Sequence, residues 1–233
     1  MEEKPKNSSK FKLREIKFNE ESYPGLLIVF CGSDGSGKTT QIKKLEELIK
    51  SKKKSCVLTK QPTEMVRQSY LFDRYIHNHD GGKEIEYRAL SFVTVSDRIQ
   101  HSLRFIKPAL ENGEVVISDR YYFSAIANLR ARGYKQDEWI YEVATWLPKP
   151  DLAIFLDVPY DESLKRVRAR PEEAKRYIDE EFERKLNAEF SLLSDAFIDA
   201  IKINTIENSP EQVFEIIQSK MIPIFNLKDL KNG

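Results

Sequence analysis

One short segment of the sequence has the residue types and the spacing of a phosphate-binding loop. Residues 32 to 39 read Gly-Ser-Asp-Gly-Ser-Gly-Lys-Thr and satisfy the pattern G-x-x-x-x-G-K-[ST]. In such a loop the glycines let backbone amides approach an anion, Lys38 reaches the β- and γ-phosphates, and the Thr39 hydroxyl suits Mg²⁺. The residues expected to contact the phosphates are Gly32, Ser33, Gly35, Ser36, Gly37, Lys38, Thr39 and Thr40.

A second segment places a carboxylate and a guanidinium next to each other. The apolar run at residues 115–118 leads directly into Asp119 and Arg120. At the end of a strand beside the loop, Asp119 would hold the water shell of the metal and Arg120 would contact a second phosphate. This pairing indicates transfer between two phosphorylated substrates.

These segments require a scaffold that brings strand ends together. Unbroken apolar runs, typical of strands covered on both faces, predict strands at residues 26–30, 55–59, 115–118, 152–158 and about 201–206. Helical periodicity predicts helices between them, including long ones at about 84–110 and around 182–197 and a basic one at 161–170. The alternation predicts an α/β fold with a parallel sheet, helices on both faces, and ligands at the carboxyl ends of the strands.

Length and composition limit the number of domains and the partners. The 233 residues carry 38 Lys and Arg against 37 Asp and Glu, a net charge of +1, so no global field would gather nucleic acid. We expect a polar extension at residues 1–24, one domain at 25–222 and a tail at 223–233. The two cysteines fit neither a disulfide framework nor a metal site, and no apolar run approaches the ~18 residues of a membrane span. A cytoplasmic protein without membrane contact is expected.

Together, these segments resemble the thymidylate (dTMP) kinases, a family of P-loop nucleoside monophosphate kinases. Residues 29–41 are similar to the phosphate loop of that family, and Asp119-Arg120-Tyr121 with Ser124 and Ala127 resembles its D-R-Y-x-x-S-x-x-A segment. Residues 96–101 resemble its A-D-R-x-Q-H helix, residues 150–158 its P-D-L-x-x-x-L-D-V strand, and residues 166–177 its arginine-rich lid. The resemblance implies a P-loop fold with a five-stranded parallel sheet and a helical lid at about residues 166–178.

The activity implied by the resemblance is Mg²⁺-dependent transfer of the ATP γ-phosphoryl group to a nucleoside 5′-monophosphate, with dTMP as the expected acceptor. Asp34 would accept a hydrogen bond from the sugar 3′-hydroxyl, Arg98 would reach the base or the phosphate, and Arg120 would hold the acceptor phosphate. The residues implied to contact the acceptor are Asp34, Thr94, Arg98, Arg120, Tyr121, Ser124 and Asn128. Family members are commonly homodimers, and the long helix at residues 87–106 is a candidate interface.

The remaining implied catalytic residues are Lys38 and two arginines of the lid. Gly35 stands where some family members have a loop arginine, so the family pattern assigns that role to the lid. The spacing of Arg166 and Arg170 predicts that they share one helical face. We expect Arg170 and Arg176 to contact the phosphates.

Three departures from the family pattern fall on the acceptor side. Thr94 replaces a phenylalanine that stacks on thymine, Asn128 replaces an aromatic residue beneath the deoxyribose, and residues 59–63 read Thr-Lys-Gln-Pro-Thr in place of T-R-E-P-G. One alternative is an enzyme acting on a different or modified pyrimidine nucleotide. The other is that Phe92, Phe123 or Tyr122 supplies the missing ring. A P-loop switch ATPase is a further alternative, which Arg98, Arg120 and the lid disfavour.

Overall fold

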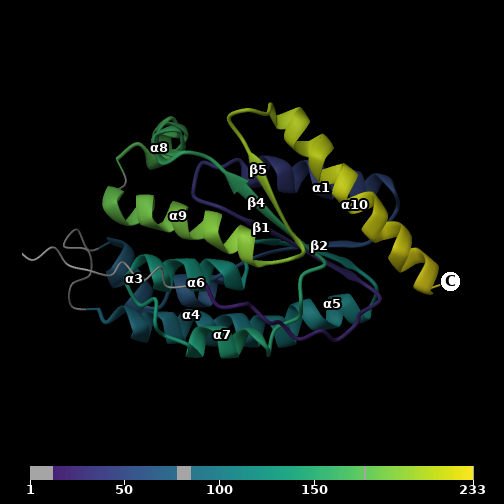
Figure 1. Ribbon diagram of the computed structural model, residues 1–233, viewed down its shortest axis with the longest axis horizontal. Coiled ribbons are helices and arrows are strands. Elements are labelled where there is room, and N and C mark those ends of the chain that lie inside the picture. The colour runs from purple at the N-terminus through teal and green to yellow at the C-terminus, as the bar shows by residue number, and fades with distance from the viewer. Residues whose placement is uncertain (1–12, 78–84, 176, 233) are drawn as a thin grey trace, which may run out of the picture.

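The computed structural model describes residues 13–77, 85–175 and 177–232. Its centre is a five-stranded parallel sheet with the strand order β2-β3-β1-β4-β5 (Figure 1). The strands are β1 (Leu26–Cys31), β2 (Cys56–Lys60), β3 (Val115–Asp119), β4 (Leu152–Asp157) and β5 (Ala200–Asn204). The α/β class and the five predicted strands are confirmed.

Helices cover both faces of the sheet. On one face lie α1 (Lys38–Ser51) and α10 (Pro210–Asn232), and on the other lie α4 (Tyr87–His101), α6 (Tyr122–Ala131) and α9 (Glu180–Ala196). The shorter helical segments are α2 (Glu64–Arg67), α3 (Tyr70–His77), η1 (Ser102–Ile106), α5 (Lys107–Glu111), α7 (Trp139–Ala144), α8 (Tyr160–Arg168) and η2 (Pro171–Glu173).

Strand β1 shows why its sequence is apolar without interruption. All six of its residues are buried, and successive side chains point to opposite faces of the sheet. Leu26, Ile28 and Phe30 pack in the core that α1 and α10 cover. Leu27 and Val29 pack in the larger core beneath α4, α6 and α9. Both faces are therefore closed, and only the ends of the strands remain for ligands.

The segment before β1 is not the separate extension that its polar composition predicts. Within the described residues 13–24, Ile16, Phe18 and Tyr23 are buried in the larger core. The Phe18 ring lies 5.3 Å from that of Phe123, and Asn19 forms an isolated parallel bridge with Pro148. The prediction fails here because the few apolar residues of the segment are those that reach the core.

Two helix predictions need correction. The predicted helix at about 84–110 is divided among α4, the π-helical segment η1 and α5. The division falls beside Pro108, which has no backbone N–H to donate to the preceding turn. At the other end of the chain, the predicted boundary at residue 222 lies inside α10, so residues 223–232 continue a helix and do not form a separate tail.

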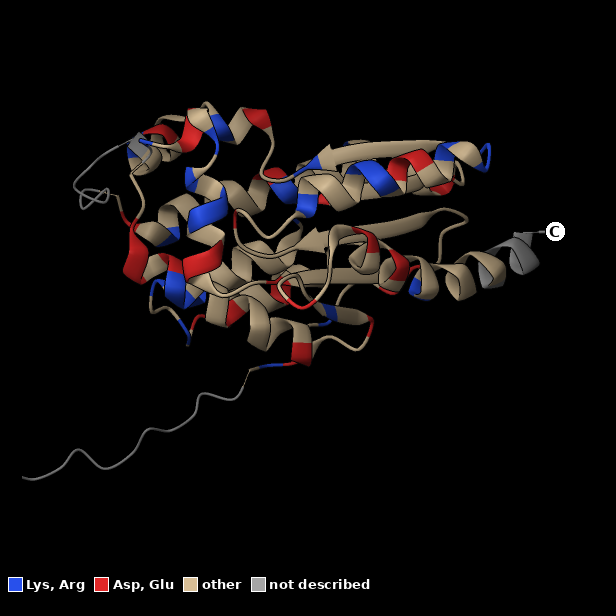
Figure 2. Cartoon of the chain, turned by 90° about the horizontal axis from the view of Figure 1, so that it is seen from above, with Lys and Arg blue, Asp and Glu red and all other residues tan. Residues whose placement is uncertain are grey.

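The surface carries charges of both signs. In the view of Figure 2, acidic and basic residues are interspersed along the helices, whereas the strands are almost free of charge. No helix within the described ranges is long and apolar enough to cross a lipid bilayer.

Candidate functional site

The glycine-rich loop connects the buried end of β1 to α1, and two of its glycines are required by close packing. Gly32 has a φ of +132°, and a Cβ there would lie 2.5 Å from the Leu156 carbonyl oxygen. Gly35 has a φ of +81°, and a Cβ there would lie 2.5 Å from the carbonyl oxygen of Ser163 in α8. The loop therefore touches the helix that leads to the predicted lid and has no room for an arginine at position 35.

Lys38 occupies the centre of this loop. Its Nζ donates to the carbonyl oxygens of Gly32 at 3.0 Å and Ser33 at 2.8 Å, and the side chain is buried. Burial lowers the pKa of Lys38 to about 8, helped by the nearby Arg120 and opposed by Asp34. The ammonium group is thus still mainly protonated at neutral pH and lies where the N-terminus of α1 also favours anions.

Asp119 is brought next to the loop by strand pairing. In the parallel ladder of β1 and β3, Phe30 is the partner of Asp119. One carboxylate oxygen lies 3.8 Å from Lys60 Nζ, while the buried Oδ1 has no hydrogen-bond partner among the described residues. An unpartnered buried carboxylate oxygen and a threonine hydroxyl are suitable groups for Mg²⁺, and Asp119 and Thr39 line the same cavity.

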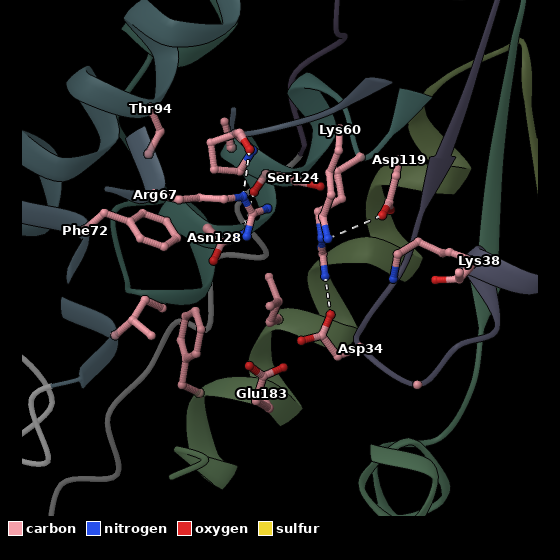
Figure 3. A pocket seen from close by; sticks show the side chains of 18 of the residues that line it. Asp34, Lys38, Lys60, Arg67, Phe72, Thr94, Asp119, Ser124, Asn128 and Glu183 are labelled. Carbon is pink, nitrogen blue, oxygen red and sulfur yellow. Dashed lines mark hydrogen bonds and ion pairs between the residues drawn. The ribbon is translucent and has the colours of Figure 1, made fainter. Parts of the chain in front are cut away.

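Arg120 follows Asp119 in a left-handed conformation, with a φ of +70°, and its N–H donates to the Phe30 carbonyl at 2.9 Å. This turn directs the guanidinium to Asp34, whose carboxylate accepts a hydrogen bond from it at 2.7 Å (Figure 3). Burial alone would lower the pKa of Arg120, but Asp34 and Asp119 raise it above its ordinary value. The arginine is therefore a fixed cation between the loop and the neighbouring cavity.

A cavity of about 450 Å³ joins the two predicted halves of the site. The loop and α1 contribute Asp34, Gly35, Gly37, Lys38, Thr39 and Thr40. The elements β3, α4 and α6 and the turn after β3 contribute Thr94, Arg98, Asp119, Arg120, Ser124 and Asn128. Gly32, Ser33 and Ser36 belong to the loop but are not among the lining residues, and the side chains of Ser33 and Ser36 are buried.

The acceptor side holds polar groups without partners. Arg98 is almost fully buried, and burial lowers its pKa to about 10 against the opposing effect of Asp97. Its Nη1 donates to the Thr94 carbonyl at 2.7 Å, whereas its Nε and the hydroxyl of Ser124 have no partner in the described part of the chain. The amide of Asn128 donates to the Ser124 carbonyl at 2.7 Å. Such unsatisfied groups beside a cavity mark where a polar ligand fits.

The structure places Tyr121 outside the cavity. Its side chain is fully buried, its hydroxyl donates to the Pro148 carbonyl at 2.9 Å, and its ring stacks on Phe18 at 5.8 Å. The extended backbone at Tyr121 turns its side chain into the core, while Arg120 before it points to the site. The expectation that Tyr121 contacts the acceptor is therefore wrong.

The lid arginines differ in their surroundings. Arg166 is held by Glu162 and Thr205, and α8 ends at Arg168. Arg170 lies beyond the helix and lines the cavity, so the predicted helical face shared with Arg166 does not exist. Arg176 lies outside the described residues, and its role stays a prediction.

Several lining residues are not among the sequence predictions. Lys60, Arg67 and Phe72 line the cavity on the acceptor side. Arg67 donates from Nε to the Pro62 carbonyl at 2.9 Å, and it lines the same cavity as Ser124 and Asn128 (Figure 3). The helical spacing of Phe72, Tyr75 and Ile76 in residues 70–77 was the available signal for Phe72.

The cavity is not lined by any of the three rings that the sequence offers in place of the missing phenylalanine. Phe92 is exposed and stacks on Trp139 at 4.3 Å. Phe123 and Tyr122 are fully buried in the larger core. None of the three lines the cavity.

Comparisons with known proteins identify the family of this chain. A family model described as thymidylate kinase matches residues 30–217. The "Probable thymidylate kinase" of Pyrococcus abyssi is 34% identical over 206 residues, which is 85% of this chain and 98% of that protein. The "Probable thymidylate kinase" of Thermococcus kodakarensis is 37% identical over 190 residues, 78% of this chain and 91% of the other. The "Thymidylate kinase" of Desulfotalea psychrophila is 32% identical over 206 residues, which is 85% of this chain and 96% of that protein.

The matched region begins in β1 and ends in α10, and thus includes the loop, all residues that line the cavity, and α8. The chain therefore belongs to the thymidylate kinase family of nucleoside monophosphate kinases.

Proposed function

We propose that this chain transfers the γ-phosphoryl group of ATP to the 5′-phosphate of dTMP, giving ADP and dTDP. The observation that carries the proposal is that Lys38 and Thr39 line the same cavity as Arg98 and Arg120. A lysine and a hydroxyl of the phosphate loop together with two arginines in one cavity suit two phosphorylated substrates held for direct transfer. Membership of the family and the names of the relatives support dTMP as the acceptor.

The reaction does not require a strong general acid or base from the protein. A phosphate oxygen of dTMP forms a bond to the γ-phosphorus, and the bond from that phosphorus to the β–γ bridging oxygen breaks, leaving its electron pair on ADP. Because the attacking oxygen is already anionic, positioning and charge neutralisation carry the catalysis. Lys38, protonated at neutral pH, would exchange its two carbonyl partners for phosphate oxygens of ATP. Arg120, held by Asp34, would orient the acceptor phosphate.

We assign Mg²⁺ to Thr39 and Asp119. Magnesium is usually held by one or two protein groups together with substrate phosphates and water, so a single carboxylate is sufficient. This is compatible with the described residues, which contain no cluster of three or more acidic, histidine or cysteine side chains. When bound, the metal would offset the negative charge on the phosphates during transfer.

The lid would complete the site from the other side. Arg170 lines the cavity directly after α8, and we assign it a contact with the transferred phosphoryl group. Closing a basic segment over the phosphates would exclude water, which otherwise competes with dTMP as the acceptor. Arg176 would act in the same segment.

A homodimer through α4 and η1 is part of the proposal. Leu103 and Phe105 on η1 are 61% and 60% exposed, although large apolar side chains are normally buried. Size-exclusion chromatography with light scattering should give twice the monomer mass, and Phe105→Glu should shift the chain to monomer. A wild-type monomer at micromolar concentration would contradict this part.

The activity is tested with ATP, Mg²⁺ and a panel of dTMP, dUMP, UMP and CMP, with each diphosphate product detected directly. We expect dTDP to form fastest. A larger rate with UMP or CMP would assign the cavity to another pyrimidine nucleotide, as Thr94 and Asn128 allow. ADP release that does not depend on any acceptor would instead indicate an ATPase.

A further inference from the structure

Three aromatic rings line the cavity, together with charged groups such as Arg67 and Glu183. Phe72 from α3, Tyr87 from α4 and Phe182 from α9 all line the cavity. Leu90 and Ile76 lie with them. Aromatic and aliphatic side chains beside a phosphate site suit a flat heteroaromatic base.

Two of these rings already contact another ring or a guanidinium. The guanidinium of Arg132 lies 3.6 Å from the centre of the Phe182 ring. Tyr87 lies 5.4 Å from the ring of Tyr75 and 5.7 Å from the same guanidinium. Phe72 has neither a ring contact nor a cation contact within the described part of the chain. Of the three, Phe72 is therefore the ring whose faces have no ring or cation contact among the described residues.

The position of Phe72 is fixed by its neighbours on α3. Tyr75 is three residues further on the same helical face, packs on Tyr87 and accepts a hydrogen bond from Arg132. These contacts anchor α3 to α4 and to the end of α6. In Figure 3 the half-buried Phe72 ring points into the cavity beside Thr94 and Asn128. An anchored helix presents its ring at little further cost in side-chain entropy.

The opposite wall leaves room for a base. The Thr94 hydroxyl donates to the Ser91 carbonyl at 3.0 Å, so this polar group is already satisfied by its own helix. Thr94 contributes no ring, and α4 therefore has only a small side chain where the family pattern has a phenylalanine. Thr94 and Phe72 line the same cavity.

We propose that the base of the acceptor nucleotide stacks on Phe72, so that α3 supplies the aromatic surface that Thr94 of α4 does not. This inference rests on the proposed function and identifies the residue that recognises the base. The acceptor phosphate would then lie towards Arg120, with its sugar between.

The test compares a ligand that has a base with one that does not. Phe72→Leu keeps the apolar volume but removes the ring, whereas Phe72→Tyr keeps the ring. Phe92→Leu is the matched control, because Phe92 stacks on Trp139 outside the cavity. Calorimetry gives the Kd of each full-length variant for dTMP and for 2-deoxyribose 5-phosphate, which has the sugar and phosphate alone. Circular dichroism verifies that each variant is folded.

We expect Phe72→Leu to weaken dTMP binding about 10-fold, as the loss of a base–aromatic stack does elsewhere. Its affinity for 2-deoxyribose 5-phosphate should stay within about twofold of wild type, and Phe72→Tyr and Phe92→Leu should keep the wild-type affinity for dTMP. An unchanged Kd for dTMP in Phe72→Leu would overturn the proposal. Equal weakening of both ligands, or a loss in Phe72→Tyr as large as in Phe72→Leu, would also overturn it, because either result indicates a structural role.

Failure of the stacking proposal is distinguishable from failure of the proposed function. If wild-type chain forms dTDP but Phe72→Leu binds dTMP normally, only the stacking proposal fails. If wild-type chain forms no dTDP at all, the proposed function fails irrespective of Phe72.

Discussion

Substituting Gly35 by alanine tests the packing between the phosphate loop and α8. The residue has a φ of +81°, and the added Cβ would lie 2.5 Å from the Ser163 carbonyl oxygen and 3.2 Å from Val167 Cγ2. Both neighbours belong to α8, and Arg170 follows that helix directly. The perturbation therefore strains the loop and pushes on the segment that leads to the lid.

The expected loss of unfolding free energy in Gly35→Ala has two parts. Placing a residue with a Cβ in the left-handed region costs about 1–2 kcal/mol. Forcing an atom into a packed space costs about 1–3 kcal/mol more, because Ser163 contributes a backbone oxygen that cannot rotate away. Gly133→Ala is the matched control, because Gly133 has a φ of +98° and nothing within 4 Å of the added Cβ. That variant should show the first part alone.

Urea unfolding and the KM for ATP measure the two consequences separately. Gly133→Ala should lose about 1–2 kcal/mol of unfolding free energy and keep its wild-type KM. Gly35→Ala should lose about 1–3 kcal/mol more and raise the KM for ATP, because the displaced loop no longer presents its amides to the phosphates. If Gly35→Ala is no less stable than Gly133→Ala and binds ATP normally, the contact between the loop and α8 does not carry the function assigned to it.

Three further predictions follow from single side chains. Since burial lowers the pKa of Lys38 to about 8, kcat/KM for ATP should fall as the pH rises above about 8, and a pH profile that is flat up to pH 10 would contradict this. Lys38→Ala should lower kcat by about 100-fold at pH 7. Phe18→Ala should lower the free energy of unfolding in urea by about 3–5 kcal/mol, because the ring is buried among other aromatic rings. A loss below about 1 kcal/mol would indicate that residues 13–24 do not contribute to the core. Arg67→Met should raise the KM for dTMP about 10-fold and leave the KM for ATP unchanged in steady-state kinetics, because Arg67 lines the cavity where the acceptor is proposed to bind. An equal rise in both KM values would contradict a role of Arg67 in binding dTMP.

The sheet and the phosphate loop could be predicted from sequence because local patterns determine them. An apolar run such as residues 26–30, followed by a glycine-rich turn, has few alternatives to a buried strand that ends at a loop. The place of Asp119 beside that loop follows from parallel pairing, and the register of Phe30 with Asp119 bears this out. Both inferences need only periodicity and general rules of topology.

The features that escaped prediction depend on contacts between distant segments. Phe18 is buried because it meets Phe123 and Phe197, more than 100 residues away in the chain. Tyr121 points into the core because the backbone changes from left-handed at Arg120 to extended at Tyr121. A sequence motif does not show in which direction each of its side chains points. The spacing of Phe72, Tyr75 and Ile76 indicates a shared helical face, but the direction of that face depends on the contacts of Tyr75 with Tyr87 and Arg132.

The most direct test of the central claim is a product analysis of wild-type chain incubated with ATP, Mg²⁺ and dTMP. Because the residues proposed to bind ATP and those proposed to bind dTMP line one cavity, we expect dTDP and ADP to appear in equal amounts. When dTMP is omitted, ADP formation should be at least about 10-fold slower. Equal amounts of ADP and inorganic phosphate, with no dTDP, would contradict the account.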